Sequence, residues 1–150
     1  DCIRSWSKEK IAKIKNPNST RPWQHVLEPL SGYLQLAYIL SKNKHINGEA
    51  FNFGPSLEKN KNVKSLVKKM ATYWQNRKWS IDRKNKSKII ENKLLSLNCE
   101  KAKEFLNWTP TLSFDEMSEF TISWYKTYYS NKKNIQNFTR TQIKDFISKY

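Results

Sequence analysis

Apolar residues recur along this chain at two spacings, one typical of helices and one typical of strands. Spacings of three and four residues place apolar side chains on a single helical face, and they occur in residues 28–42, 63–74, 99–106, 117–128 and 143–150. Residues 1–8 fit the end of a further helix. Short apolar runs favour strands or extended segments, and these lie at residues 11–14, 23–26, 50–53, 79–81 and 94–97. The pattern therefore predicts a mixed α/β fold, with short strands among several helices.

Polar side chains stand just ahead of several of these stretches, where they can bind the free amide groups at a helix start. Asn62 and Asn98 each precede an apolar periodic stretch and can act as N-caps. Ser113 and Glu116 have the spacing of a capping box, in which each side chain bonds the other residue's backbone amide. Thus we expect helices to begin next to these residues.

The last apolar stretch is preceded by a similar polar pair. Thr139 and Gln142 have the spacing of a second capping box. This spacing predicts that the final helix begins just after Thr139. The residues before it, 130–137, are polar and are expected to form a connector.

The charge of the chain is strongly one-sided. Lys and Arg number 28 against 13 Asp and Glu, which gives a formal net charge of +15. Such an excess attracts polyanions or phosphorylated ligands. Richness in Lys, Asn and Ile is also what an AT-rich genome produces, so composition alone accounts for part of the charge. Residues 59–88 combine basic residues with Trp74 and Trp79, which leaves open a nucleic-acid-binding module as well as an ordinary solvated helix face.

Several classes of protein are disfavoured by what the sequence lacks. Its three glycines cannot form a Gly-rich phosphate loop, and its longest apolar runs are far shorter than a membrane span. No secretion signal is visible at the N-terminus. Cys2, Cys99, His25 and His45 are not spaced as metal ligands. The sequence therefore predicts a cytoplasmic protein with reduced thiols and no metal site.

Arg21 is the leading candidate for binding a phosphorylated ligand. It follows the turn predicted at Asn16-Pro17-Asn18 and leads into an extended segment and a helix. The planar guanidinium of Arg matches phosphate oxygens two at a time. Glu28, seven residues on, could orient a polar neighbour or pair with a cation. A surface Arg beside a buried Trp23 is the competing interpretation from the residues alone.

A longer string around Arg21 resembles one family. The string Arg21-Pro-Trp-Gln-His-Val-Leu-Glu-Pro-Leu-Ser-Gly-Tyr-Leu34 is similar to a segment of the CDP-glucose 4,6-dehydratases, which are extended short-chain dehydrogenases/reductases. Further matches follow in order: Asp1-Cys-Ile-Arg4, Asn16-Pro17, Ala50-Phe-Asn-Phe-Gly-Pro55 and Trp108-Thr-Pro110. The resemblance covers roughly residues 1–129. Residues 130–150 lie outside it and are expected to form the polar connector and an amphipathic helix.

The resemblance implies a fold and a set of binding residues. The chain would be the C-terminal, substrate-binding portion of the α/β fold of an extended short-chain dehydrogenase/reductase. Arg21 would contact the diphosphate of CDP-glucose, and Asn52 would lie near the phosphates. Trp23 and Glu28 would build that wall of the site, and His25 would line the same pocket.

The resemblance also implies a reaction whose catalytic half is absent from this chain. Family members use tightly held NAD to oxidise C4 of the sugar, water leaves across C5 and C6, and the hydride returns to C6. NAD binds an N-terminal doubly wound domain that carries a Tyr-x-x-x-Lys pair. Similar strings here begin at Tyr38, Tyr128 and Tyr129, downstream of Arg21 instead of upstream, so we expect none to be catalytic.

The expected partners follow from the missing half. We expect the N-terminal nucleotide-binding domain and CDP-glucose as partners, a homo-oligomeric parent enzyme, and a deoxysugar pathway such as that of lipopolysaccharide O-antigen. We expect no turnover by the 150-residue chain alone. Because this piece would lack its packing partner, exposed apolar surface is expected to cause self-association.

Some positions depart from the family pattern. Ile90-Glu-Asn92 stands where the family has His-Glu-Ala, Asn98 replaces an Asp, and Asn107 stands where a Gly is usual. Asn can substitute for Gly where the backbone is left-handed. A related nucleotide-sugar epimerase, reductase or dehydratase of other base specificity remains an alternative.

Overall fold

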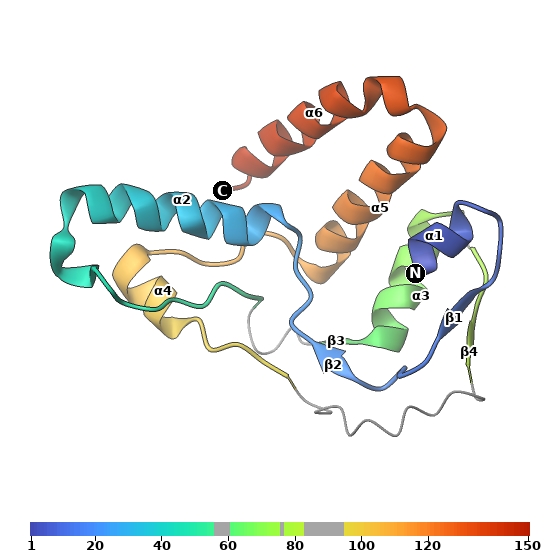
Figure 1. Ribbon diagram of the computed structural model, residues 1–150, viewed down its shortest axis with the longest axis horizontal. Helices are drawn as coiled ribbons and strands as arrows, with labels where there is room; N and C mark the ends of the chain where they lie inside the picture. The colour runs from blue at the N-terminus through green and yellow to red at the C-terminus, as the bar shows by residue number, and fades with distance from the viewer. Residues whose placement is uncertain (56–60, 76, 83–94) are drawn as a thin grey trace.

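The computed structural model describes residues 1–55, 61–75, 77–82 and 95–150 and is built mainly of helices (Figure 1). Its α-helices are α1 (Cys2–Trp6), α2 (Leu27–Lys42), α3 (Val63–Tyr73), α4 (Glu100–Leu106), α5 (Phe114–Ser130) and α6 (Ile135–Ile147). Short 3-10 helices span Lys44–Ile46 and Lys132–Asn134. The strands are β1 (Ala12–Ile14), β2 (Thr20–Arg21), β3 (Lys61–Asn62) and β4 (Trp79–Ile81). The predicted fold class, short strands among several helices, is confirmed.

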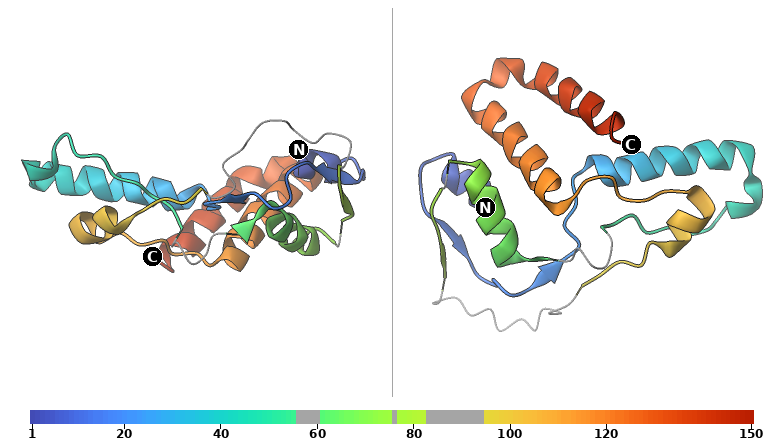
Figure 2. Two further views of the ribbon diagram at one scale, coloured as in Figure 1. Left: turned by 90° about the horizontal axis from the view of Figure 1, so that it is seen from below. Right: turned by 180° about the vertical axis from the view of Figure 1, so that it is seen from behind.

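The strands form two small ladders in the described residues. β1 pairs in parallel with β4, with Ala12 opposite Trp79, and β2 pairs antiparallel with β3. α1, β1, β4 and α3 lie on one side of the molecule, and α2 and α4 lie on the other (Figures 1 and 2). α6 folds back along α5. The β2–β3 pair therefore lies where the chain passes from one side to the other.

Aromatic residues fill much of the core beneath β1. One cluster joins α1, β1, α3 and α5 through Trp6, Ala12, Ile14, Val67, Ala71, Trp74 and Ile122. Trp6 is fully buried, and its Nε1 donates a hydrogen bond to the Lys78 carbonyl at 3.0 Å. Its ring meets Trp74 edge to face, with centroids 6.1 Å apart, a geometry that adds to the gain from burial alone.

Two further clusters hold the other helices. One lies under α2 and α4 and contains Ile46, Phe53, Ala102, Leu106 and Trp108. The other joins α3, α5 and α6 through Leu66, Leu112, Met117 and Phe146. Gly32 is required where α2 crosses the first of these clusters, because a β-carbon there would lie 2.3 Å from the Phe53 ring.

Three local start and stop signals are confirmed, whereas the N-cap predicted at Asn98 is wrong by one residue. The N-cap of α4 is Cys99, and Asn98 Oδ1 accepts from the Glu100 amide at 2.9 Å. The Asn62 side chain accepts from the Ser65 amide at 2.8 Å at the start of α3. Ser113 and Glu116 form both bonds of the predicted capping box before α5. Asn107 ends α4 in the left-handed conformation, with a φ of 51°, as expected for an Asn in place of Gly.

The second predicted capping box is wrong. α6 begins at Ile135, so Thr139 lies inside the helix, where its hydroxyl donates to the Ile135 carbonyl at 2.8 Å and accepts from Trp124 at 2.8 Å. The Gln142 amide donates to the Phe120 carbonyl on α5 at 2.8 Å. These polar groups are satisfied across the α5–α6 contact, which local spacing does not reveal.

The connector and some strands also differ from the prediction. α5 extends through Ser130 and α6 starts at Ile135, which shortens the polar connector expected at residues 130–137. Residues 23–26, 50–53 and 95–97 belong to no ladder of the described residues. A strand needs a neighbouring strand as well as a suitable sequence. Leu94, residues 90–92 and all but Asp82 of the basic loop at 82–88 lie outside the described residues.

Candidate functional site

The segment from Arg21 to Glu28 passes from a strand pair to a helix. β2 ends at Arg21, residues 22–25 belong to no helix or strand, and α2 follows. Arg21 is half-buried, and its Nη1 donates to the Thr20 carbonyl at 2.7 Å. In the antiparallel register Arg21 lies directly opposite Lys61 of β3. The strand pair therefore places two cationic residues side by side.

Trp23 fixes the position of β3 next to Arg21. Its Nε1 donates to the Lys61 carbonyl at 2.8 Å, and the ring is half-buried. Lys61 is therefore held from two sides, by the strand register and by the Trp23 indole.

Gln24 links the segment to Asn52. Its Nε2 donates to the Phe53 carbonyl at 2.9 Å. Its Oε1 is buried and has no hydrogen-bond partner among the described residues. Asn52 is exposed, and its side-chain amide donates to the Asn98 carbonyl at 3.2 Å. The structure thus brings the neighbourhood of Asn52 to the predicted segment through a residue that the sequence analysis did not single out.

His25 is buried and uncharged at neutral pH. The side chain is 8% exposed, and its Nδ1 accepts from the Leu27 amide at 3.4 Å. Its ring meets Phe120 edge to face, with centroids 5.6 Å apart. Burial lowers the pKa of His25 from its usual value, because desolvation disfavours the imidazolium. His25 therefore contributes shape and polarity to the pocket and no positive charge.

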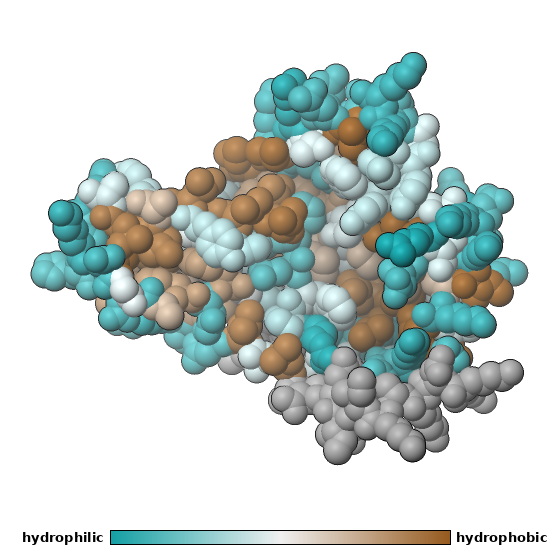
Figure 3. All heavy atoms as spheres, viewed as in Figure 1, coloured by the Kyte–Doolittle hydropathy of each residue, from teal (hydrophilic) through white to brown (hydrophobic). Residues whose placement is uncertain are grey.

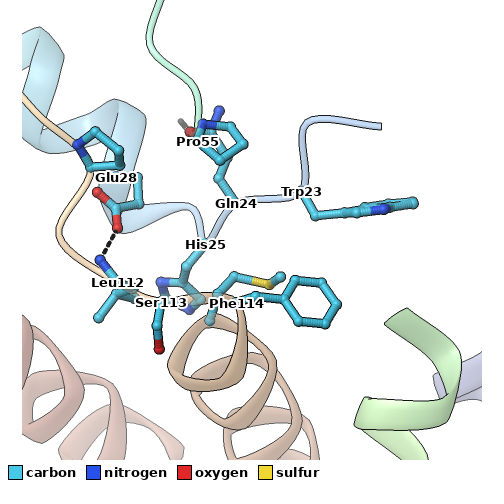
Figure 4. Close-up of a pocket in the computed structure, with 10 residues that line it drawn as sticks. Trp23, Gln24, His25, Glu28, Pro55, Leu112, Ser113 and Phe114 are labelled. Carbon is cyan, nitrogen blue, oxygen red and sulfur yellow. Dashed lines mark hydrogen bonds between the residues drawn. The ribbon is translucent and has the colours of Figure 1, made fainter. Parts of the chain in front are cut away.

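Glu28 is a buried carboxylate that binds backbone amides. It is 1% exposed, and it accepts from Thr111 at 3.0 and 3.1 Å and from Leu112 at 2.6 Å. The carboxylate lies at the start of α2 and faces the segment that leads into α5 (Figure 4). Glu28 thus joins two parts of the chain and sets the position of the helix that follows the Arg21 segment.

Trp23, Gln24, His25 and Glu28 line a narrow pocket, whereas Arg21 and Asn52 are not among its lining residues (Figure 4). Its free volume is about 10 Å³, close to that of one water molecule. Its lining comes from the Arg21 segment, from Pro55 and from the start of α5: Trp23, Gln24, His25, Glu28, Pro55, Pro110, Leu112, Ser113, Phe114 and Met117. A space of this size is too small for a sugar nucleotide, so such a ligand would lie outside it.

Two larger hollows flank the segment. A hollow of about 660 Å³ lies between α1, β1, α3 and α5, and Trp23 lines it together with basic and aromatic residues: Arg4, Lys13, Lys15, Tyr125 and Tyr129. This combination suits a ligand with both an anionic group and a planar ring. A second groove, of about 500 Å³, is more apolar and runs between α2, α5 and α6: Val26, Leu27, Leu30, Trp124, Tyr125 and Ile143.

Comparison with known proteins identifies the relatives of this chain. No family model matches the sequence. The CDP-glucose 4,6-dehydratase of Salmonella typhimurium is 36% identical to it over 149 residues, which is 99% of this chain. The chain is similar along its whole length to the C-terminal part of that dehydratase. It spans about 41% of the relative's length.

This similarity confirms the resemblance predicted from the Arg21 string and extends it. Since 149 residues align, the match also includes the part after residue 129 that the sequence analysis left outside. Among solved structures, RMD from Pseudomonas aeruginosa complexed with NADPH superimposes with a TM-score of 0.63 at 15% identity. The match covers 83% of this chain and 39% of that chain. It shows that the two share a fold.

Sequence reasoning missed two residues of the site, Gln24 and Lys61. Gln24 lies inside the string that resembles the dehydratases, so the string itself was the available signal. Lys61 is placed opposite Arg21 only by the register of strands two residues long, which leave no periodic pattern in a sequence.

The Tyr-x-x-x-Lys strings that begin at Tyr38 and Tyr128 make contacts between residues close in sequence. Lys42 Nζ donates to the Tyr38 hydroxyl at 2.5 Å on the exposed end of α2, a contact between successive helical turns. Lys132 Nζ lies 5.4 Å from the centre of the Tyr128 ring.

Among the described residues, no three His, Cys, Asp or Glu side chains group as metal ligands do. In that same part of the chain, no helix has the length and apolar character needed to span a membrane.

Proposed function

We propose that this chain is the sugar-nucleotide-binding part of an NAD-dependent CDP-glucose 4,6-dehydratase, in which Arg21 binds the diphosphate. The observation that carries the proposal is the 36% identity to the Salmonella typhimurium enzyme over 149 residues. In that reaction CDP-glucose would become CDP-4-keto-6-deoxyglucose with loss of water. The proposal places the assembly in the cytoplasm, as a homo-oligomer in a deoxysugar pathway such as that of lipopolysaccharide O-antigen.

The strand pair supports an anion beside Arg21. Arg21 and Lys61 lie directly opposite each other, and like charges in that position destabilise a strand pair. A diphosphate bound beside them would attract both cations and so offset this repulsion. The Arg21 guanidinium offers paired donors to phosphate oxygens, while Lys61 adds a point charge.

The neighbouring residues then have distinct tasks. The Trp23 indole donates to the Lys61 carbonyl and so positions Lys61. The exposed Asn52 precedes Phe53, whose carbonyl accepts a hydrogen bond from Gln24. Glu28 positions the start of α2, because its carboxylate accepts hydrogen bonds from the backbone amides of Thr111 and Leu112. His25 remains neutral and lines the pocket behind them.

The chemistry itself needs the part of the dehydratase that lies outside the stretch matched by this chain. NAD, when bound by the N-terminal nucleotide-binding part, supplies the transient oxidation of the sugar and the returning hydride. The residues of this chain bind and orient the nucleotide sugar against that cofactor. We therefore propose that the 150-residue chain has no turnover by itself.

Thermal denaturation with different ligands tests the proposed specificity. CDP-glucose should raise the melting temperature of the chain more than UDP-glucose or dTDP-glucose at the same concentration, because a ligand that binds only the folded state stabilises it. Equal shifts with all three would contradict the CDP assignment. Weak, salt-sensitive stabilisation by any polyanion would favour the nucleic-acid-binding alternative that the charge of +15 suggests.

A further inference from the structure

Two neighbouring side chains of the Arg21 segment bind backbone carbonyls of two other segments. Trp23 Nε1 donates to the Lys61 carbonyl at 2.8 Å, across 38 residues of sequence. Gln24 Nε2 donates to the Phe53 carbonyl at 2.9 Å, across 29 residues. Figure 4 shows the two side chains leaving the segment in different directions. The residues that follow Arg21 therefore connect it with two parts of the chain that are distant in sequence.

The orientation of the Gln24 amide follows from its partner. A carbonyl oxygen only accepts hydrogen bonds, so Gln24 Nε2 must face Phe53. Gln24 Oε1 is then buried without a hydrogen-bond partner among the described residues. In the same part of the chain no backbone amide donates to the carbonyl of Phe53, so an apolar side chain at position 24 would leave that carbonyl unpaired instead. In both cases one acceptor lacks a partner, so the Gln24 contact contributes more to position than to stability.

Asn52 is held from two sides. It directly precedes Phe53, whose carbonyl Gln24 binds. Asn52 Nδ2 donates to the Asn98 carbonyl at 3.2 Å. An amide nitrogen carries two hydrogens, so this bond directs one of them and leaves the other for a further acceptor. Because Asn52 is exposed, a ligand can reach that hydrogen from outside.

The Phe53 ring and the Phe53 carbonyl attach the same segment to different parts of the fold. The ring meets Tyr33 and Trp108 edge to face, with centroids 5.5 and 5.0 Å apart. These ring contacts hold residues 50–53 against α2 and the core. The carbonyl, in contrast, is bound by Gln24, so this bond sets the position of the segment relative to Arg21.

We propose that Gln24 is a positioning residue of the diphosphate site, which holds Asn52 at a fixed distance from Arg21 so that both contact one diphosphate. The proposal rests on the proposed function for the identity of the ligand. Gln24 does not touch the ligand, because its amide is bound to Phe53 on one side and buried on the other. The affinity for CDP-glucose therefore depends on Gln24 only through Asn52.

A double-mutant cycle with Gln24→Met and Asn52→Ala tests this dependence. Met has about the length of Gln but donates no hydrogen bond. In isothermal calorimetry each single variant should bind CDP-glucose at least about fivefold more weakly than the unsubstituted chain. The double variant should bind less than about twofold more weakly than Asn52→Ala, because the two residues act as one unit. Full affinity in either single variant, or losses that multiply in the double variant, would overturn the proposal.

Gln35→Met is the matched control, because it removes the same kind of hydrogen bond elsewhere. Gln35 Nε2 donates to the Leu106 carbonyl at 3.1 Å, between α2 and the end of α4. Hydrophobic side chains gather along the region of α2 in Figure 3, and the one charged residue at positions 27–41 is the buried Glu28. That surface offers a diphosphate no attraction, so Gln35→Met should bind CDP-glucose as the unsubstituted chain does. Equal losses of affinity in Gln35→Met and Gln24→Met would assign the effect to the fold as a whole and contradict a positioning role.

A measurement without ligand separates this proposal from the proposed function. In nuclear magnetic resonance spectra the side-chain amide signals of Asn52 should shift in Gln24→Met and stay in place in Gln35→Met. Gln24→Asn, whose shorter side chain keeps the amide out of reach of Phe53, is a second variant that preserves polarity and should shift the same signals. Unmoved Asn52 signals in both Gln24 variants would refute the positioning role. Shifted signals in a chain that binds no CDP-glucose would support the positioning of Asn52 by Gln24 and contradict the proposed function.

Discussion

The Glu28 carboxylate accepts a hydrogen bond from the Leu112 amide at 2.6 Å, although 84 residues separate the two in sequence. This contact ties the start of α2 to the segment that enters α5. Because α2 follows directly on the Arg21 segment, the contact also sets where the candidate site lies relative to the core.

Replacing Glu28 should therefore destabilise the fold. Glu28→Gln removes the charge and places an amide group against backbone donors, which should cost about 1–3 kcal/mol of unfolding free energy. Urea denaturation measures this loss. Glu119→Gln, at an exposed position of α5, is the matched control and should change stability by less than about 0.5 kcal/mol. Equal stability of the two variants would show that the Glu28 contacts contribute nothing.

The backbone conformation of Asn107 predicts a second pair of variants. Its φ of 51° lies in the left-handed region, where a β-carbon is unfavourable and Gly is not. Asn107→Ala should lower the unfolding free energy by about 1 kcal/mol, and Asn107→Gly should preserve or raise it. Thermal denaturation of both variants tests this. A more stable Ala variant would contradict the assigned end of α4.

The capping box of α5 predicts a dependence of stability on pH. Hydrogen bonds from Lys149 and from Ser113 lower the pKa of Glu116 from 4.5 to about 2. A carboxylate whose pKa is lower in the folded state stabilises that state above pH 4.5, and this contribution is lost as the pH falls toward 2. Glu116→Gln can keep the capping hydrogen bond but loses the ion pair with Lys149, so at neutral pH it should lower stability by less than about 1 kcal/mol.

The difference between Glu116→Gln and the unsubstituted chain should shrink steadily as the pH falls from 4.5 to 2. Melting temperatures of both proteins across this range provide the measurement. A difference that stays constant across it would show that the Glu116 charge has no part in the cap.

These contacts also show what local sequence can predict. Ser113 and Glu116 are three residues apart and bond each other, so their spacing was sufficient. Thr139 and Gln142 have the same spacing, but each bonds α5 instead. Thr139 accepts from the Trp124 indole, and Gln142 donates to the Phe120 carbonyl. A pattern restricted to a few residues cannot distinguish a capping partner from a tertiary one.

The candidate site likewise contains some residues that local sequence predicts and others that only tertiary contacts reveal. The Arg21 string was visible in the sequence because it is continuous, and the similarity to the dehydratase confirms the family resemblance. Lys61 became part of the site only through strand register, and the Glu28 partners lie beyond residue 110. Segment 50–53 has the composition of a strand, yet no strand of the described residues pairs with it.

The exposed face of α2 predicts the solution behaviour of the purified chain. Leu34 is 74% exposed, and an uncovered apolar stripe promotes self-association. We expect concentration-dependent association in sedimentation experiments, reduced by Leu34→Glu. A clean monomer at all concentrations, with a sharp cooperative melt, would contradict this expectation.

Titration of CDP-glucose into the chain and its Arg21→Gln variant tests the central claim most directly. Isothermal calorimetry should show binding to the unsubstituted chain and a Kd at least about tenfold higher for Arg21→Gln, because a paired guanidinium–phosphate contact is lost. Arg140→Gln, at an exposed position of α6, should bind as the unsubstituted chain does. Equal affinity of Arg21→Gln and Arg140→Gln for CDP-glucose would contradict the assignment of Arg21 to the diphosphate.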